Sequence, residues 1–296
     1  MKNVMYQVGE TEAGKRIDSF LAEKDSDITR ALIKKFKDNL LLNGSAVKLS
    51  HVVRLGDQVE LSYKKEIVVH NLVAEDIPVP IIYEDQHLLV VNKPFGMVVH
   101  PAKGNWQGTL INALYSHLQK VSGEDMRPGI VHRLDKETSG LIVLAKEPDT
   151  QLALMRLFKE REVLKVYHTL VEGFLVHTSG EIDTPIGRDP KNRLRYMVRE
   201  DGREALTEFM LKREYQKISW VEVTLHTGRT HQIRVHFASL GNPIVGDSIY
   251  GRKYKQYPMC LVAKKLGFEH PVTGEYMEWE IDLPEYFIKT RAEFGG

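Results

Sequence analysis

Two clusters of polar residues stand out in this sequence because each combines side chains that can donate, accept or transfer protons. The first runs from 128 to 141 and holds an imidazole, a guanidinium, two carboxylates and two hydroxyls. The second runs from 227 to 236 and contains two arginines and two imidazoles. Loops braced by strands are a common place for chemistry. A solvated turn is the simpler interpretation of either cluster, so the residue types must show whether a catalytic site is the better one.

A carboxylate nucleophile paired with an arginine is the chemistry that these clusters favour. An aspartate beside an arginine stays ionised, because a nearby positive charge lowers the pKa of a carboxylate by ~1–3 units. Asp135 and Arg234 could form such a pair. An ionised aspartate can bond covalently to a sugar carbon or to an electrophilic base carbon. Attack there implies a nucleoside substrate, whereas an ordinary structural salt bridge would give the same pairing without chemistry.

Other catalytic arrangements fit the two clusters less well. His132, Asp135 and His231 could ligate a metal, but the sequence has no His-Glu-x-x-His motif, and the interleaved arginines would repel a divalent ion. We therefore expect no metal site. Ser139 lacks the Gly-x-Ser-x-Gly elbow of serine hydrolases. A glycosidase would need Asp135 and Glu137 at a separation of about 5 Å, which a sequence does not give.

The composition is that of an ordinary globular protein, with a length that suggests two domains of about 150 residues each. The chain has 296 residues, of which 42% are hydrophobic and 27% charged, and its net charge is +1. The single cysteine, Cys260, excludes an internal disulfide and fits a reducing compartment. No segment approaches the ~20 apolar residues that span a bilayer. We expect a cytoplasmic protein without membrane contact.

Residues 1–66 predict a small αα-β domain. Apolar residues recur at helical spacing in 17–21 and 28–36, which indicates two amphipathic helices. Strands that turn at Asn43-Gly44 and at Gly56-Asp57 should follow. Basic side chains lie largely on the polar face of the second helix, and these include Lys34 and Lys35. A solvated helix face would show the same pattern.

The rest of the chain predicts a linker and a larger domain. Two closely spaced prolines oppose regular structure in 67–80, which we interpret as the linker. Residues 81–296 predict an α+β domain with a long, mainly antiparallel mixed sheet flanked by helices and loops. In this domain we expect 97–101 to be a strand and 110–121 to be a helix that begins at Thr109.

A basic stretch lies between 186 and 199. Five basic residues oppose one acidic residue there, which gives a local charge of +4: Arg188, Lys191, Arg193, Arg195 and Arg199. Phosphate contacts supply much of the affinity of proteins for RNA, so this stretch could contact an RNA backbone. A strand edge protected by charged side chains would look the same.

Five blocks of sequence resemble the RluA/RluD-type pseudouridine synthases in order and approximate spacing. They are 92–101, 132–141, 165–167, 227–236 and 241–247. The likeness runs from about Ile81 to the end of the chain. The first 66 residues are similar to an S4-type RNA-binding domain, with matching motifs at 14–21, 42–44 and 56–57.

This resemblance implies an isomerase that converts uridine to pseudouridine in RNA without a metal or an organic cofactor. Asp135 matches the catalytic aspartate of the family, which acts on a flipped-out uridine so that the base detaches, turns and rejoins through carbon 5. Tyr167 matches the tyrosine that stacks on the base, and Arg234 the arginine that orients the aspartate. Arg133 matches the arginine that fills the space left by the flipped base. Leu261 matches a leucine near the base, although Leu-Val-Ala stands here where the family often has Leu-His-Ala.

The resemblance and the basic segments together indicate which residues contact RNA, and the resemblance implies which RNA is modified. The expected contacts come from His132, Arg133, Arg193, Arg195, Arg229, Leu261, Lys34 and Lys35. Ribosomal RNA is the favoured substrate, ahead of transfer RNA, and we expect a monomer. A non-catalytic RNA-binding or ribosome-assembly protein is the alternative, and it would function without Asp135. A metal-dependent nuclease using His132, Asp135 and His231 is a third hypothesis.

Overall fold

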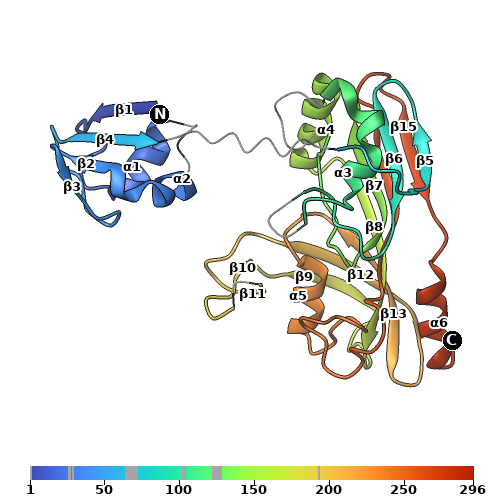
Figure 1. Ribbon diagram of the computed structural model, residues 1–296. Helices are drawn as coiled ribbons and strands as arrows, with labels where there is room; N and C mark the ends of the chain where they lie inside the picture. The colour runs from blue at the N-terminus through green and yellow to red at the C-terminus, as the bar shows by residue number, and fades with distance from the viewer. Residues whose placement is uncertain are drawn as a thin grey trace. The chain divides into compact units, whose positions relative to one another are not determined.

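The computed structural model describes residues 2–25, 28, 30–63, 73–101, 105–121, 129–192 and 194–296 (Figure 1). The chain divides into two compact units, Met1–His70 and Asn71–Gly296, and each is described by itself. The expected linker, 67–80, is described only from Val73 onward. Arg193 and the side chain of Lys35 lie outside what the structure describes.

The first unit is a small sheet with two helices. Its elements are β1 (Lys2–Gln7), α1 (Ile17–Lys24), α2 (Arg30–Lys35), the 3-10 turn η1 (Lys37–Asn39), β2 (Leu40–Leu42), β3 (Ser45–Ala46) and β4 (Gln58–Tyr63). Within the described residues, the four strands pair antiparallel in the order β1-β4-β2-β3. The expected helical periodicity is confirmed, because Ile17, Phe20 and Leu21 of α1 pack with Ile33 of α2 in one buried core.

Two expectations for this unit need correction. The predicted strand before Gly56 is absent, since Val52 forms only an isolated bridge with Arg16. Strand β1, in contrast, was not expected from the sequence, and it fills the edge of the sheet beside β4. The hairpin turn between β2 and β3 is confirmed, because Asn43 and Gly44 have φ values of 50° and 76°, as a tight hairpin turn requires.

The second unit is built on one large mixed sheet. Its strands are β5 (Ile81–Glu84), β6 (Leu88–Lys93), β7 (Ser139–Ala145), β8 (Leu164–Glu172), β9 (Ser179–Asp183), β12 (Leu206–Glu214), β13 (Ile218–Leu225), β14 (Leu261–Glu269) and β15 (Tyr276–Glu280). In the described part of the chain, nine strands form this sheet in the order β5-β6-β7-β14-β8-β13-β12-β9, with β15 added at β14. The β7–β14 pair is parallel, and the other pairs are antiparallel. The predicted α+β class is confirmed.

Alternate residues of the central strands point to opposite sides of this sheet, so both of its faces carry apolar side chains, and helices cover both faces. In β6, Leu89 and Val91 pack toward α3 (Leu110–Leu114), the 3-10 helix η2 (Tyr115–Val121) and α5 (Gln232–Ser239). Leu88 and Val90 pack toward α4 (Pro148–Glu160) and α6 (Glu285–Glu293). Every residue of β7 is buried, so this strand lies at the centre of the core.

The stretch 97–101 was expected to be a strand, and the structure shows instead an irregular segment before α3. The carbonyl of Val98 accepts the N–H of Leu110 at 2.9 Å, so this segment satisfies a free N–H at the start of α3. The expected start of that helix at Thr109 is confirmed, because the Thr109 side chain accepts the N–H of Asn112 at 3.3 Å.

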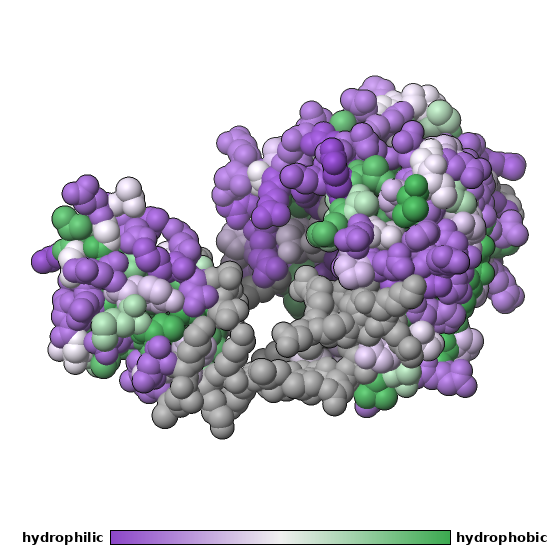
Figure 2. Space-filling view, turned by 90° about the horizontal axis from the view of Figure 1, so that it is seen from above, coloured by the Kyte–Doolittle hydropathy of each residue, from purple (hydrophilic) through white to green (hydrophobic). Residues whose placement is uncertain are grey.

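The visible surface of each unit in Figure 2 is mostly hydrophilic, with small hydrophobic patches between the polar residues. None of the helices in the described ranges has the length and apolar character needed to cross a membrane.

Candidate active site

Asp135 lies in the segment 129–138, which leads directly into the central strand β7. The N–H of Thr138 donates to the Asp135 carbonyl at 3.1 Å and closes a turn that presents the Asp135 side chain. The loop after β6 braces this turn, because the N–H of Gly96 donates to the Lys136 carbonyl at 2.9 Å. The position of Asp135 thus depends on two neighbouring strands.

A buried lysine fastens the same two loops together. Lys93, at the end of β6, donates from Nζ to the carbonyls of Pro94 at 3.0 Å, Met97 at 2.9 Å and Lys136 at 3.3 Å. Burial lowers the pKa of Lys93 to about 7, and the negative charge of Asp135 opposes that shift. The three carbonyls also favour the ammonium, since only the protonated form can donate three hydrogen bonds.

Arg234 of α5 is fixed by a buried ion pair before it reaches Asp135. Its Nε and Nη2 donate to Asp247 at 2.7 and 2.9 Å, in the two-point geometry that arginine forms with carboxylates. Burial opposes ionisation of Asp247, but the hydrogen bonds and charge of Arg234 outweigh it and hold the pKa of Asp247 below its usual value. The N–H groups of Ile249 and Tyr250 also donate to this carboxylate, at 2.8 and 2.9 Å.

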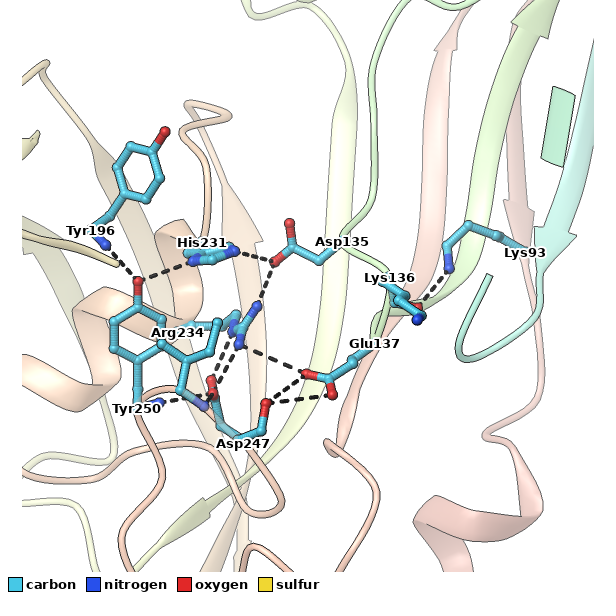
Figure 3. Close-up of polar contacts among 11 residues, drawn as sticks. Lys93, Asp135, Lys136, Glu137, Tyr196, His231, Arg234, Asp247 and Tyr250 are labelled. Atoms are coloured by element: carbon cyan, nitrogen blue, oxygen red, sulfur yellow. Dashed lines mark hydrogen bonds and ion pairs between the residues drawn. The ribbon is translucent and has the colours of Figure 1, made fainter. Parts of the chain in front are cut away.

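The remaining donor of Arg234 turns toward Asp135 (Figure 3). Arg234 Nη1 donates to Asp135 Oδ2 at 3.1 Å, and His231 Nε2 lies 3.7 Å from the same oxygen. Among the residues that the structure describes, none forms a polar contact with Oδ1 of Asp135. Glu137 lies farther from Arg234, at 3.9 Å. Within the described residues, the carboxylate is therefore held through Oδ2 alone.

Asp135 faces a cavity of about 100 Å³ that its own segment and the 225–234 region enclose. Tyr167 of β8 and Leu261 of β14 line this cavity as well, and their side chains are almost fully buried. Burial raises the pKa of the Tyr167 phenol, and the negative charge of Asp135 raises it further. The structure thus brings together around one cavity Asp135, Tyr167, Arg234 and Leu261, the four residues that the resemblance places near the target base.

Arg133 and Arg229 also line the cavity, Arg133 with an exposed side chain. Arg229 is fixed at two points. Its Nε donates to the Glu204 carbonyl at 2.8 Å, and its N–H donates to the buried Gln232 side chain at 2.9 Å. Gln232 also accepts the hydroxyl of Thr227 at 2.8 Å, so one amide shapes the loop that leads into α5.

The basic stretch forms a two-stranded antiparallel hairpin, β10 (Ile186–Arg188) and β11 (Tyr196–Val198). A hollow of about 400 Å³ lies beside this hairpin, and Arg188, Arg203 and Arg229 line it together with Tyr196. This hollow shares the loop 228–230 with the cavity at Asp135. Arg195 is exposed, and its guanidinium lies over the ring of Tyr250 at 5.2 Å.

His132 does not join the site, which corrects its expected role in RNA contact. Its ring stacks on Phe158 of α4 with centroids 4.4 Å apart, and its Nε2 accepts the N–H of Val143 at 3.1 Å. Burial lowers the pKa of His132 to about 3, so the ring is neutral at pH 7. His132 therefore belongs to the packing between β7 and α4.

No group of three or more metal-ligating side chains gathers within the described ranges. The nuclease hypothesis required His132, Asp135 and His231 to converge, whereas only His231 lies near Asp135. Sequence reasoning assigned no role to Lys93 or Asp247, although both fall inside the recognised blocks. A buried arginine needs a carboxylate partner. If Arg234 had been expected to be buried, a search for a carboxylate besides Asp135 could have identified Asp247.

Comparison with known proteins gives the class of this enzyme. The model of the RNA pseudouridylate synthase family matches residues 87–239. The chain belongs to this family, and its activity is that of an RNA pseudouridine synthase, an isomerase.

Individual relatives match over almost the whole chain. An uncharacterized RNA pseudouridine synthase of Aquifex aeolicus is 46% identical, over 92% of this chain and 91% of the relative. The RNA pseudouridine synthase YlyB of Bacillus subtilis is 44% identical, with 96% of each chain covered. The ribosomal large subunit pseudouridine synthase D of Xanthomonas campestris is 38% identical, over 94% and 88%.

Solved structures show a similar fold. The human RNA pseudouridylate synthase domain containing 1 superposes with a TM-score of 0.59 at 27% identity, over 71% of this chain and 85% of that chain. Human RNA pseudouridylate synthase domain containing 4 gives a TM-score of 0.60 at 26% identity, over 73% and 93%.

Proposed function

We propose that this chain isomerises uridines in large-subunit ribosomal RNA, with Asp135 as the catalytic carboxylate. The observation that carries the proposal is the one-sided hold on Asp135, whose Oδ2 is bound by Arg234 while Oδ1 has no polar contact within the described residues. Several relatives are named for the ribosomal large subunit, which supports the choice of RNA.

The reaction moves one glycosidic bond without changing the atoms of the nucleotide. The flipped-out uridine enters the cavity, Asp135 acts on its ribose, and the bond between N1 and C1′ breaks. The released uracil turns and forms a bond from C5 to C1′. The hydrogen on C5 is lost to a base and N1 gains a proton, so no oxidant, reductant or cofactor is consumed. Arg234 stabilises the carboxylate when it leaves.

Tyr167 is proposed to contact the uracil and to take part in the proton transfer. Burial and the charge of Asp135 both raise the pKa of its phenol, so Tyr167 is protonated before the reaction starts. When Asp135 acts on the ribose, its negative charge is neutralised. One of the two causes of the raised pKa is then removed, so Tyr167 can give its proton to N1 of the uracil more readily, and the phenolate that results can accept the hydrogen that C5 loses.

The RNA around the target is proposed to follow the basic surface beside the cavity. Arg133 lies at the cavity, where it can fill the space of the flipped base, and Arg188, Arg203 and Arg229 line the adjoining hollow. Backbone phosphates are the natural ligands of such a surface. We also propose that residues 1–66 are an S4-like RNA-binding domain in which the exposed Lys34 contacts RNA, joined by the linker 67–80 to a catalytic domain, 81–296.

The test is release of tritium from unmodified large-subunit ribosomal RNA labelled at C5 of uridine, because each isomerisation loses that hydrogen. We expect release by the natural protein and a loss of at least about a thousandfold in Asp135→Asn, which keeps the size of the side chain but removes its charge. Binding of RNA should be unchanged in this variant. Equal release by Asp135→Asn would refute the catalytic role of Asp135, whereas a natural protein that binds the RNA without releasing tritium would favour the non-catalytic RNA-binding alternative.

A further inference from the structure

His231 occupies an unusual position between the catalytic carboxylate and a tyrosine. It precedes the first residue of α5 with φ of 59°, in the left-handed region that residues other than glycine rarely adopt. This conformation turns its ring so that each nitrogen has a neighbour (Figure 3). Nε2 lies 3.7 Å from Asp135 Oδ2, and Nδ1 lies 3.0 Å from the hydroxyl of Tyr250.

The partners of Tyr250 determine which nitrogen of His231 carries the proton. The backbone N–H of Tyr196 donates to the Tyr250 hydroxyl oxygen at 2.8 Å. The hydroxyl has therefore accepted one hydrogen bond and still has its own proton to donate, and Nδ1 of His231 is the acceptor beside it. If Nδ1 accepts, a neutral imidazole carries its hydrogen on Nε2, which faces Asp135.

The carboxylate leads to the same assignment independently. An ionised carboxylate can only accept hydrogen bonds, so a bare Nε2 lone pair facing Oδ2 would be repelled, whereas an Nε2–H is attracted. Burial lowers the pKa of His231, although the charge of Asp135 opposes that shift, and a lowered pKa favours the neutral ring. The rings of Tyr196 and Tyr250 meet the imidazole at 73° and 83°, each with centroids 5.7 Å away, and fix its plane.

We propose that His231 is a positioning residue for Asp135, and that Tyr250 sets it in the tautomer whose Nε2–H faces Oδ2. This inference rests on the proposed role of Asp135. Arg234 and His231 then both direct donors at Oδ2, which keeps Oδ1 turned toward the ribose. The 3.7 Å separation is longer than a hydrogen bond, and catalytic hydrogen bonds often shorten when the substrate binds.

The same contacts connect the RNA surface to the catalytic carboxylate. Tyr196 begins β11 of the basic hairpin, and its N–H is the group that anchors Tyr250. The path from hairpin to carboxylate thus passes through Tyr250 and His231. A displaced hairpin would leave the Tyr250 hydroxyl without its anchor, and the tautomer of His231 would no longer be fixed.

Nitrogen-15 NMR of the full chain with labelled histidine tests the tautomer directly. We expect the His231 signals, assigned by their loss in His231→Asn, to show an Nε2–H and an unprotonated Nδ1 at pH 7.5 in the natural protein. Tyr250→Phe should give a mixture of tautomers. Asparagine is the chosen replacement because it tolerates the left-handed backbone of residue 231. An Nδ1–H form or a charged ring in the natural protein would overturn the proposal.

Kinetics with the tritium-release assay test the positioning role. We expect kcat to fall roughly tenfold in Tyr250→Phe and further in His231→Asn, with the KM for RNA unchanged. If Tyr250 acts through His231, the double variant should be no slower than His231→Asn alone. Tyr254→Phe is the matched control, because this tyrosine packs against Tyr257 and Phe294, and it should keep the natural kcat.

The outcomes separate this inference from the proposed function. Activity that is lost in Asp135→Asn but keeps its natural kcat in both His231→Asn and Tyr250→Phe would refute the positioning role alone. Multiplied effects in the double variant would refute the path through His231. Unchanged activity in Asp135→Asn would refute the proposed function itself. The NMR assignment in the natural protein holds for either kinetic result, so a variant that folds poorly does not leave the proposal without a test.

Discussion

Arg234 is a rigid donor because Asp247 already binds two of its nitrogen atoms. The Arg234 side chain is 3% exposed and that of Asp247 0%, so neither has water as an alternative partner. Only Nη1 is left for Asp135. In the proposed reaction, a donor held in this way needs no rearrangement when charge shifts on Asp135.

Replacing Asp247 should therefore affect stability as well as activity. We expect Asp247→Ala to lower the free energy of unfolding by about 3–5 kcal/mol, because it leaves the Arg234 charge buried without its partner. Asp247→Asn keeps the shape and should lose less. The lowered pKa of Asp247 means that its contribution is present above the unfolded-state pKa of ~3.9 and is lost as the pH falls through the lower folded-state value.

Urea unfolding of the natural protein and of both variants, repeated from pH 7 to pH 2.5, measures these differences. The gap between natural protein and Asp247→Asn should be constant from pH 7 to about pH 5 and should shrink below pH 4. A gap that is the same at all pH values would contradict the assigned charge of Asp247.

The site residues that could be predicted from the sequence are those that lie in the blocks resembling the family. Asp135, Tyr167 and Arg234 could be grouped because each belongs to a block that resembles the family. His132 was misjudged, because adjacency to Arg133 in sequence does not show that its ring fills the space against Phe158. The contact of Tyr250 with His231 joins residues 19 positions apart in the sequence, and no local pattern encodes it.

At the scale of elements, the parallel contact of β7 with β14 depends on one glycine. Gly140 pairs with Ala263 and has φ of 117°, and an added Cβ would lie 2.3 Å from the Ala263 carbonyl oxygen. This close approach joins the strand that follows Asp135 to the strand that begins with Leu261. A side chain at this position would push apart the two elements that frame the cavity.

Gly140→Ala should consequently destabilise the catalytic unit more than positive φ alone explains. Gly274→Ala is the matched control, since Gly274 has φ of 72° and open space around its Cβ position. We expect the control to lose about 1 kcal/mol of unfolding free energy and Gly140→Ala to lose a further ~1–3 kcal/mol from the clash. Urea midpoints of the two variants measure the difference, and equal midpoints would show that β7 and β14 separate without strain.

Elements with strong periodicity were predicted well, and those that depend on neighbours were not. The helical spacing in 110–121 follows from local sequence, and this segment is helical, although it forms α3 and continues as the 3-10 helix η2 instead of one α-helix. The apolar run at 97–101 has strand-forming residues, but its carbonyls bind the first turn of α3 instead of a neighbouring strand. The edge strand β1 was missed because its pairing with β4 joins residues more than fifty positions apart.

At the scale of the whole molecule, the net charge does not reveal the basic surface beside the cavity. The chain carries only +1, yet the exposed Arg133 lines the cavity and the exposed Arg188 and Arg203 line the hollow beside it. We expect the double variant Arg188→Ala, Arg195→Ala to bind RNA more weakly and to reduce the slope of log affinity against log salt by ~0.7 for each phosphate that is no longer bound. Filter binding from 50 to 300 mM salt measures this slope.

The control for this prediction is Arg156→Ala on α4, an equally exposed arginine paired with Glu160 on the opposite face of the sheet. Its salt slope should match that of the natural protein. If both variants lower the slope by the same amount, the arginines act through overall charge and the hairpin has no special part in binding.

The place of β14 in the sheet constrains the order in which the catalytic unit can fold. This strand lies between β7 and β8, yet the chain reaches it about ninety residues after β8 has been synthesised. Strands β7 and β8 both pair with β14 and not with each other, so the centre of the sheet cannot form before this distant segment is available. Such non-local closure is slow, on the order of milliseconds to seconds. A ribosome must therefore release most of this chain before the chain can modify any RNA.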